Sequence, residues 1–205
     1  LNILTLLDLS ENSLKTLPSG LLQGLGNLQV LSLSENQLTT LDYQLFNNLS
    51  NVRSLLLGGN EFKSLYDYLF RSVNKVEYLF LSRNQLKSLG TNIFSGLYSL
   101  KVLDIAYNII THLDFHIFRD IVSITYIKLS YNKLTECPDI KHLTRLRLLI
   151  LSGNTLTGIS HGTFSALPVN SELAVSQHEI CECYVPAGVK CSASYKRSPY
   201  LTCDR

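Results

Sequence analysis

The chain has 205 residues, of which 45% are hydrophobic and 17% charged. This hydrophobic content excludes a disordered polar chain. Eighteen basic against 16 acidic side chains give a net charge of +2, which is no electrostatic reason to expect nucleic acid or an anionic membrane as a partner. No apolar run approaches the ~18 residues of a membrane-spanning helix, so we expect membrane attachment only through segments outside this chain.

Asparagines recur along the chain with a period of 24 residues. They are Asn12, Asn36, Asn60, Asn84, Asn108 and Asn132, and Asn154 follows after 22 residues. Each asparagine ends an LxxLxLxxN block, the first of which has Leu4, Leu7 and Leu9 at its apolar positions. A period of this length is typical of a solenoid, in which every repeat forms one coil.

Each block predicts a short parallel strand with one face inward, over its xLxL part (residues 6–9 and 30–33 in the first two coils). Further inward columns begin at Leu14 and Leu17. A third column is mostly aromatic and comprises Leu22, Phe46, Phe70, Phe94, Phe118 and Phe164. We expect these rings to fill the wider, outer side of the arch. The shorter sixth repeat has no ring in this column.

The seven consecutive blocks resemble the leucine-rich repeat family. The resemblance implies an α/β solenoid, namely a curved right-handed array with a concave parallel β-sheet. It also implies that the asparagine amides pair with backbone groups of adjacent turns, so that these residues are structural. Cys137 occupies a leucine position, which indicates a small buried side chain and not a reactive thiol.

The repeats predict two regions. Residues 1–167 hold seven leucine-rich repeats, and residues 168–205 hold a degenerate eighth repeat and a C-terminal cysteine cap. Leu173 and Val175 stand at strand positions of the eighth repeat, and His178 replaces its asparagine. We expect the cap to cover the open edge of the last coil.

Four cysteines, Cys181, Cys183, Cys191 and Cys203, predict a disulfide cap and therefore an extracellular or cell-surface location. Cys181 and Cys183 are too close to bond with each other in standard geometry. Two pairings remain open, and resemblance to C-terminal leucine-rich repeat caps favours Cys181–Cys191 with Cys183–Cys203. A metal site with His178 is the alternative, but CxC lacks the usual CxxC spacing. We expect no metal and no cofactor.

Asn48 begins a glycosylation sequon, Asn48-Leu49-Ser50. A glycan on Asn48 would mark the convex or flanking side as free of the binding partner. The sequence opens at Leu1 with a patterned stretch, without an initiator methionine or the layout of a signal peptide. We therefore expect a processed or recombinant fragment.

The x residues of the blocks project from the concave side of the sheet, where coils follow one another at ~4.8 Å. An aromatic zone of mixed charge spans coils four to six. It comprises Tyr78, Phe80, Arg83, Lys101, Asp104, Tyr107, Tyr126, Lys128 and Tyr131, with Arg147 at its border. Tyrosine and arginine are enriched at interface hot spots, so the zone predicts a binding site for a protein or glycan ligand.

Two other interpretations of this zone remain open. In the first, Tyr78 and Phe80 only shield neighbouring strands, and Arg53, Glu77 and Lys101 form a cross-strand ladder of charges. In the second, the exposed aromatic area is the contact of a homodimer.

Catalysis is not expected, because the sequence lacks GxSxG, HExxH and a phosphate-binding glycine loop. The repeats resemble variable lymphocyte receptors and Toll-type ectodomains, which implies immune recognition of microbial surface components. The C-terminal SPYLTCDR resembles leucine-rich repeat G-protein-coupled receptors, which implies as an alternative the ectodomain of a hormone-type receptor. An adhesion protein is a further alternative. The N-terminal cysteine cap of the first two groups is absent from the sequence.

Overall fold

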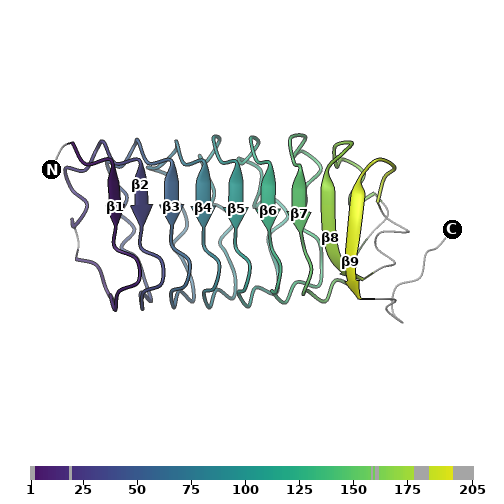
Figure 1. Ribbon diagram of the computed structural model, residues 1–205, viewed down its shortest axis with the longest axis horizontal. Coiled ribbons are helices and arrows are strands. Elements are labelled where there is room, and N and C mark those ends of the chain that lie inside the picture. Colours follow the sequence, from purple (N-terminus) through teal and green to yellow (C-terminus); the bar gives the residue numbers. More distant parts are fainter. Residues whose placement is uncertain (1–2, 19, 158, 160–161, 178–184, 196–205) are drawn as a thin grey trace.

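The computed structural model describes residues 3–18, 20–157, 159, 162–177 and 185–195. Within these residues the chain forms an elongated solenoid with one nine-stranded sheet, in which the strands follow one another in chain order (Figure 1). The strands are β1 (Leu6–Asp8), β2 (Val30–Ser32), β3 (Ser54–Leu56), β4 (Tyr78–Phe80), β5 (Val102–Asp104), β6 (Tyr126–Lys128), β7 (Leu148–Ile150), β8 (Glu172–Gln177) and β9 (Lys190–Tyr195). Every neighbouring pair is parallel.

The strand register follows the sequence repeat. Leu7 pairs with Leu31, which pairs with Leu55, so the same block position recurs in each coil. Ile127 pairs with Leu149 in the same way, although this repeat is two residues shorter. The shortening is therefore absorbed in the return segment, and the sheet continues without a shift.

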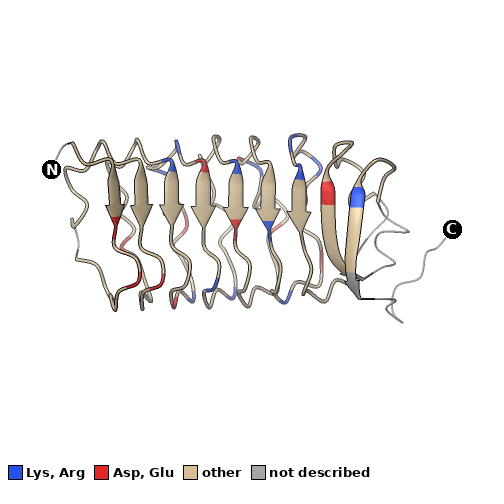
Figure 2. Cartoon of the chain, viewed as in Figure 1, with Lys and Arg blue, Asp and Glu red and all other residues tan. Residues whose placement is uncertain are grey.

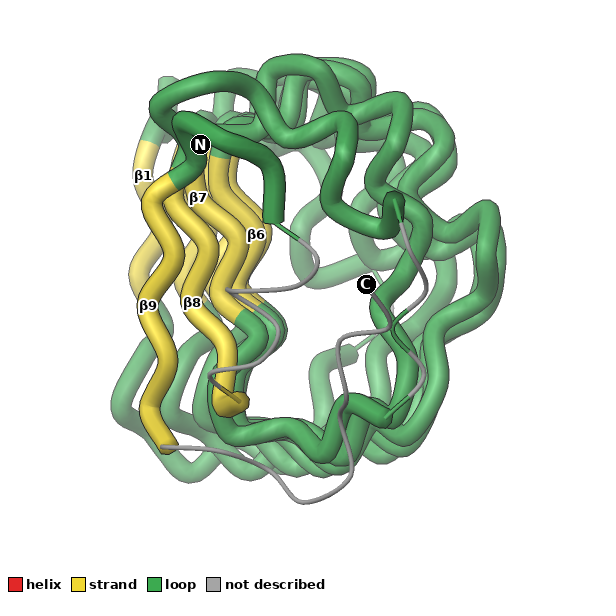
Figure 3. Tube along the Cα trace, turned by 90° about the vertical axis from the view of Figure 1, so that its right-hand side faces the viewer, coloured by secondary structure: helices red, strands yellow, loops and turns green. Residues whose placement is uncertain are grey.

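The leucine-rich solenoid with a parallel sheet is confirmed, whereas the helical part of the expected α/β class is not present in the described residues. Figure 3 shows the strands on one side of the coil and loops around the rest. In the second coil the amide of Leu45 donates to the Asp42 carbonyl and that of Leu49 to the Phe46 carbonyl. Hydrogen bonds between residues three apart make a succession of turns, and α-helices need bonds between residues four apart. Nowhere in the described ranges does a helix reach the length and apolar character needed to cross a membrane.

The interior of each coil is apolar, and its aromatic column is fully enclosed. All rings of this column are at most 1% exposed. Phe46 stacks with Phe70 at a centroid distance of 5.9 Å, and Phe94 stacks with Phe118 at 6.2 Å. The predicted aromatic column therefore forms part of a continuous core, which each coil completes only against its neighbours.

The repeating asparagines form the predicted ladder of hydrogen bonds. Asn108, which is 6% exposed, donates from its amide to the carbonyls of Leu81 in the preceding coil and Ile105 in its own coil, both at 3.1 Å. Its Oδ1 atom accepts from the Leu86 amide at 3.0 Å. The same bonds to the preceding coil recur at Asn36, Asn60, Asn84, Asn132 and Asn154. These side chains join neighbouring coils and satisfy buried backbone groups.

At the C-terminal end the sheet continues past the seventh coil. Leu173 and Val175 of β8 are buried, as expected for a degenerate eighth repeat. The segment that we expected to cover the open edge contributes β9, which pairs with β8 in parallel and covers its edge; the sequence pattern did not reveal that this segment forms a strand. Cys191 lies in β9 and is partly buried. Its expected partners Cys181, Cys183 and Cys203 lie outside the described residues, as does His178, so the disulfide cap stays a prediction.

Candidate ligand-binding face

The sheet face is the surface formed by the outward side chains of β1–β8 and of the residues that flank these strands. In β4 the middle residue Leu79 is fully buried, while Tyr78 and Phe80 point outward, as the alternation of a strand requires. The register places Phe80 beside Asp104, and Asp104 beside Lys128. The strands therefore bring the predicted site residues of coils four to six onto one surface.

A left-handed backbone conformation recurs at the residue directly before each asparagine. The φ angles are 55° at Glu11, 50° at Glu35, 65° at Gly59, 55° at Arg83, 54° at Tyr107, 53° at Tyr131 and 77° at Gly153. For residues other than glycine this conformation costs roughly 1–2 kcal/mol. We call these positions the left-handed column. Sequence reasoning missed this conformation, and the glycines at two of the seven positions were the available signal.

The left-handed conformation continues the hydrogen bonding between coils. The Arg83 amide donates to the Ala106 carbonyl at 3.0 Å, and the Tyr107 amide donates to the Ser130 carbonyl at 2.9 Å. Since these bonds fix the backbone, the direction in which each side chain leaves it is fixed as well.

Three consecutive residues of the left-handed column form an exposed stack. The rings of Tyr107 and Tyr131 lie 4.6 Å apart with an interplanar angle of 12°. The Arg83 guanidinium lies 5.9 Å from the centroid of the Tyr107 ring, within the range of a cation–π contact. At the next position, a Cβ on Gly153 would lie only 2.7 Å from the Tyr131 ring. We call Arg83, Tyr107 and Tyr131 the aromatic stack.

Two further tyrosines of the predicted site lie at the other end of the strands, whereas Phe80 is the last residue of β4. Tyr78 and Tyr126 are 38% and 41% exposed and stand on either side of Val102 in the register. The structure thus separates the predicted zone into two aromatic groups. Between them, the Asp104 carboxylate accepts a hydrogen bond from the Ala106 amide at 3.0 Å, which stabilises its own turn.

A charge ladder crosses the sheet face where β3, β4 and β5 begin. Glu77 contacts Arg53 and Lys101, each at 2.6 Å. The hydrogen bond from Lys101 is the main cause that lowers the pKa of Glu77; partial burial opposes this effect, and Arg53 adds to it. The ladder that the sequence suggested as an alternative role is therefore present. Lys101 already has an ionic partner, while Arg147 has no ion pair among the described residues.

The other singled-out residues lie away from the sheet face. Asn48 is exposed in a turn of the return segment, with φ of 70°. Cys137 is a free thiol packed against the core, and burial raises its pKa to about 12, so the reactive thiolate is suppressed at neutral pH. In the part of the chain that the structure describes, no three His, Cys, Asp or Glu side chains are grouped to hold a metal ion.

This architecture defines a leucine-rich repeat solenoid, a class typical of non-catalytic binding modules. The leucine-rich repeat family matches residues 2–62, 50–99 and 74–134, and a second description of the same repeat matches residues 145–167. The chain belongs to the leucine-rich repeat family. No catalytic family is indicated, and no curated protein matches the chain.

Solved structures place the chain near Toll-type and other leucine-rich repeat proteins. The matched protein chain in a crystal structure of the TLR13–ssRNA13 complex has 30% sequence identity to this chain. Its TM-score is 0.81, and the match covers 96% of this chain and 29% of that chain. The Leptospira interrogans protein LIC12759 is 32% identical, with a TM-score of 0.70 over 76% of this chain and 39% of that one. The APL1 leucine-rich repeat domain, at 23% identity and a TM-score of 0.75 over 95% of this chain and 45% of that domain, shows the fold alone. The chain spans less than half the length of each.

Proposed function

We propose that the chain is an extracellular, non-catalytic recognition module that captures microbial surface components on its sheet face. The aromatic stack carries this proposal. Its two tyrosines, Tyr107 and Tyr131, are 50% and 54% exposed. The backbone of both residues is held in the left-handed conformation. A fixed, solvent-facing pair of rings loses little conformational freedom on binding, and this favours affinity.

The chemistry of the stack favours a partner with both apolar and polar surface. Tyrosine rings offer flat apolar area, and their hydroxyls offer hydrogen bonds. In the left-handed column, Arg83 carries positive charge in coil four, whereas Glu11 and Glu35 make the first two coils acidic. Lys128 in β6 adds a second positive charge beside the stack. This asymmetry orients a ligand whose acidic side faces the stack. The likeness to a Toll-type receptor supports an immune role.

The test is a binding screen of the chain against bacterial wall components, secreted proteins and single-stranded RNA. For the ligand that is found, we expect Tyr107→Ala with Tyr131→Ala to weaken binding at least 10-fold, as for hot-spot residues. Tyr43→Ala is the matched control, because Tyr43 is 62% exposed in a return segment. Circular dichroism checks that the fold is unchanged.

Two results would contradict the proposal. Unchanged affinity of the double variant would remove the sheet face as the binding site. Concentration-dependent dimerisation that the double variant abolishes, without capture of any ligand, would assign the stack to a homodimer contact. Capture of RNA would contradict the expectation drawn from the near-neutral net charge.

A further inference from the structure

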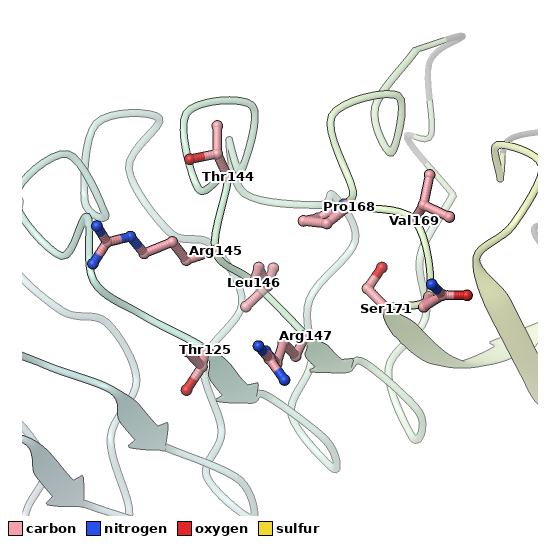
Figure 4. Close-up of a pocket in the computed structure, with 9 residues that line it drawn as sticks. Thr125, Thr144, Arg145, Leu146, Arg147, Pro168, Val169 and Ser171 are labelled. Atoms are coloured by element: carbon pink, nitrogen blue, oxygen red, sulfur yellow. The ribbon is translucent and has the colours of Figure 1, made fainter.

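A hollow of about 580 Å³ lies beside the sheet face, where β6, β7 and β8 begin. It is lined by Thr125, Thr144, Arg147 and Ser171 together with Arg145 and the Pro168–Asn170 segment (Figure 4). Its volume falls within the range of small-molecule sites. The hollow is separate from the aromatic stack, which lies beyond the other end of the strands.

One wall of the hollow carries a buried polar group without a partner. Ser171 is 2% exposed. Its hydroxyl oxygen is buried and has no hydrogen-bond partner among the described residues. Figure 4 shows this hydroxyl pointing toward the Pro168–Val169 segment, which also lines the hollow. An unsatisfied buried hydroxyl is unfavourable, and a ligand oxygen that accepts a hydrogen bond from it would remove this cost.

The opposite wall carries uncompensated positive charge. Neither Arg145 nor Arg147 forms an ion pair or side-chain hydrogen bond with any described residue, and both are exposed. Figure 2 shows positive residues at the start of β7 and in the loop that precedes it. The carboxylate of Glu172, which follows Ser171 in the chain, is paired with Lys190 at 3.7 Å. The field in the hollow is therefore positive.

A comparable hollow at the other end of the solenoid shows what is specific to this one. It has about 440 Å³ and is lined by Thr5, Gln29 and Arg53 at the same position of their coils. There the Arg53 guanidinium is neutralised by Glu77 at 2.6 Å, and no buried hydroxyl among the described residues of its lining lacks a partner. Of these two hollows, the one beside β7 combines guanidinium groups that have no ionic partner among the described residues with an unsatisfied donor.

We propose that the hollow beside β7 binds a sugar unit that carries a carboxylate or a sulfate group. Guanidinium groups bind carboxylates and tetrahedral oxyanions through paired hydrogen bonds, which assigns the anionic group to Arg147 with Arg145 at the rim. Ser171 donates to a ligand oxygen, and Thr144 and Asn170 offer groups for sugar hydroxyls. A single acidic side chain of a peptide would fill only a small part of the volume.

The experiment titrates the chain with glucuronic acid, glucose 6-sulfate and neutral glucose, with binding followed by NMR chemical shifts. We expect both anionic sugars to bind at least 10-fold more tightly than glucose. Arg147→Gln should weaken their binding at least 10-fold, and Ser171→Ala several-fold without lowering the melting temperature of the free chain. Arg53→Gln, which removes the arginine at the same position of coil three, should leave the affinity unchanged.

The outcomes separate this proposal from the one for the sheet face. The double variant Tyr107→Ala with Tyr131→Ala should bind glucuronic acid as the unaltered chain does. Equal affinity for glucose and glucuronic acid, or no effect of Arg147→Gln, would overturn the proposal. Tighter binding of N-acetyl-glutamate amide than of either anionic sugar would overturn the sugar class and assign the hollow to an acidic peptide.

Discussion

The buried asparagine of each coil and the residue directly before it are neighbours in the chain but follow opposite rules. Asn84, Asn108 and Asn132 share one residue type, are at most 8% exposed and make the same hydrogen bonds. The left-handed column beside them holds glutamate, glycine, arginine or tyrosine, and its tyrosines are about half exposed. The first column holds the coils together, and the second presents side chains to a partner.

This contrast explains how one scaffold carries different surfaces. The interior satisfies the backbone of every coil in the same way, so it gives no information on the ligand. The left-handed column has its backbone fixed by bonds between coils, and its side chains are free to differ. Substitutions should therefore affect stability strongly in the interior and weakly on the sheet face.

The largest loss of stability is expected in the aromatic column. Phe94 is fully buried and stacks with Phe118, so Phe94→Ala should lower the free energy of unfolding by about 3–5 kcal/mol, as for other large-to-small core substitutions. Urea unfolding measures this value. Phe115→Ala is the control, because Phe115 is 60% exposed. Equal effects of the two substitutions would contradict the role of the column.

The second largest loss of stability is expected when one ladder asparagine is removed. Asn108→Ala leaves the Leu86 amide and the carbonyls of Leu81 and Ile105 without this partner, so we expect a loss of about 3 kcal/mol. Asn74→Ala, at an exposed asparagine, should change the stability by less than about 0.5 kcal/mol. A loss at Asn108 as small as that at Asn74 would show that water replaces the ladder.

A smaller loss of stability is expected at Gly153, the residue of the left-handed column that follows the aromatic stack. Gly153→Ala places a Cβ at 2.7 Å from the Tyr131 ring at a φ of 77°, whereas Gly96→Ala has a φ of 82° and open space around the Cβ. Gly96→Ala should cost about 1 kcal/mol for the backbone alone. Gly153→Ala should cost more and should shift the NMR signals of the Tyr131 ring. Identical stabilities with an unmoved ring would contradict the packing of the stack on Gly153.

The smallest effect is expected for the charge ladder. Glu77→Gln breaks the contacts with Arg53 and Lys101, and because both cations are exposed we expect a loss of at most about 1 kcal/mol. The folded-state pKa of Glu77 is lowered, so its contribution is present above the unfolded pKa of about 4.3 and is lost as the pH falls further. Unfolding at pH 7 and pH 3 measures this difference. Glu61→Gln, at an exposed glutamate, is the control and should change the stability at pH 7 by less than about 0.5 kcal/mol.

Part of the candidate site was predictable from residue positions. The repeat placed Phe80, Asp104 and Lys128 in one row, and the register shows that row. It also placed Tyr107 and Tyr131 in one column, but their stacking depends on left-handed φ angles that leucine spacing does not encode. The hollow beside β7 was not predictable, because Arg147 and Ser171 come from different coils and the missing partner of a hydroxyl is visible only in three dimensions.

By itself, the sequence determined the solenoid, the strand register and the inward columns, because a 24-residue period repeats the same burial pattern and the same hydrogen-bonding asparagine in each coil. The tertiary structure decided that turns take the place of helices in the described return segments and that the edge of β8 is covered by a parallel strand, β9. It also decided which arginines have ionic partners. These features depend on contacts between side chains and backbone of neighbouring coils, and a one-dimensional pattern does not contain the distances that set them.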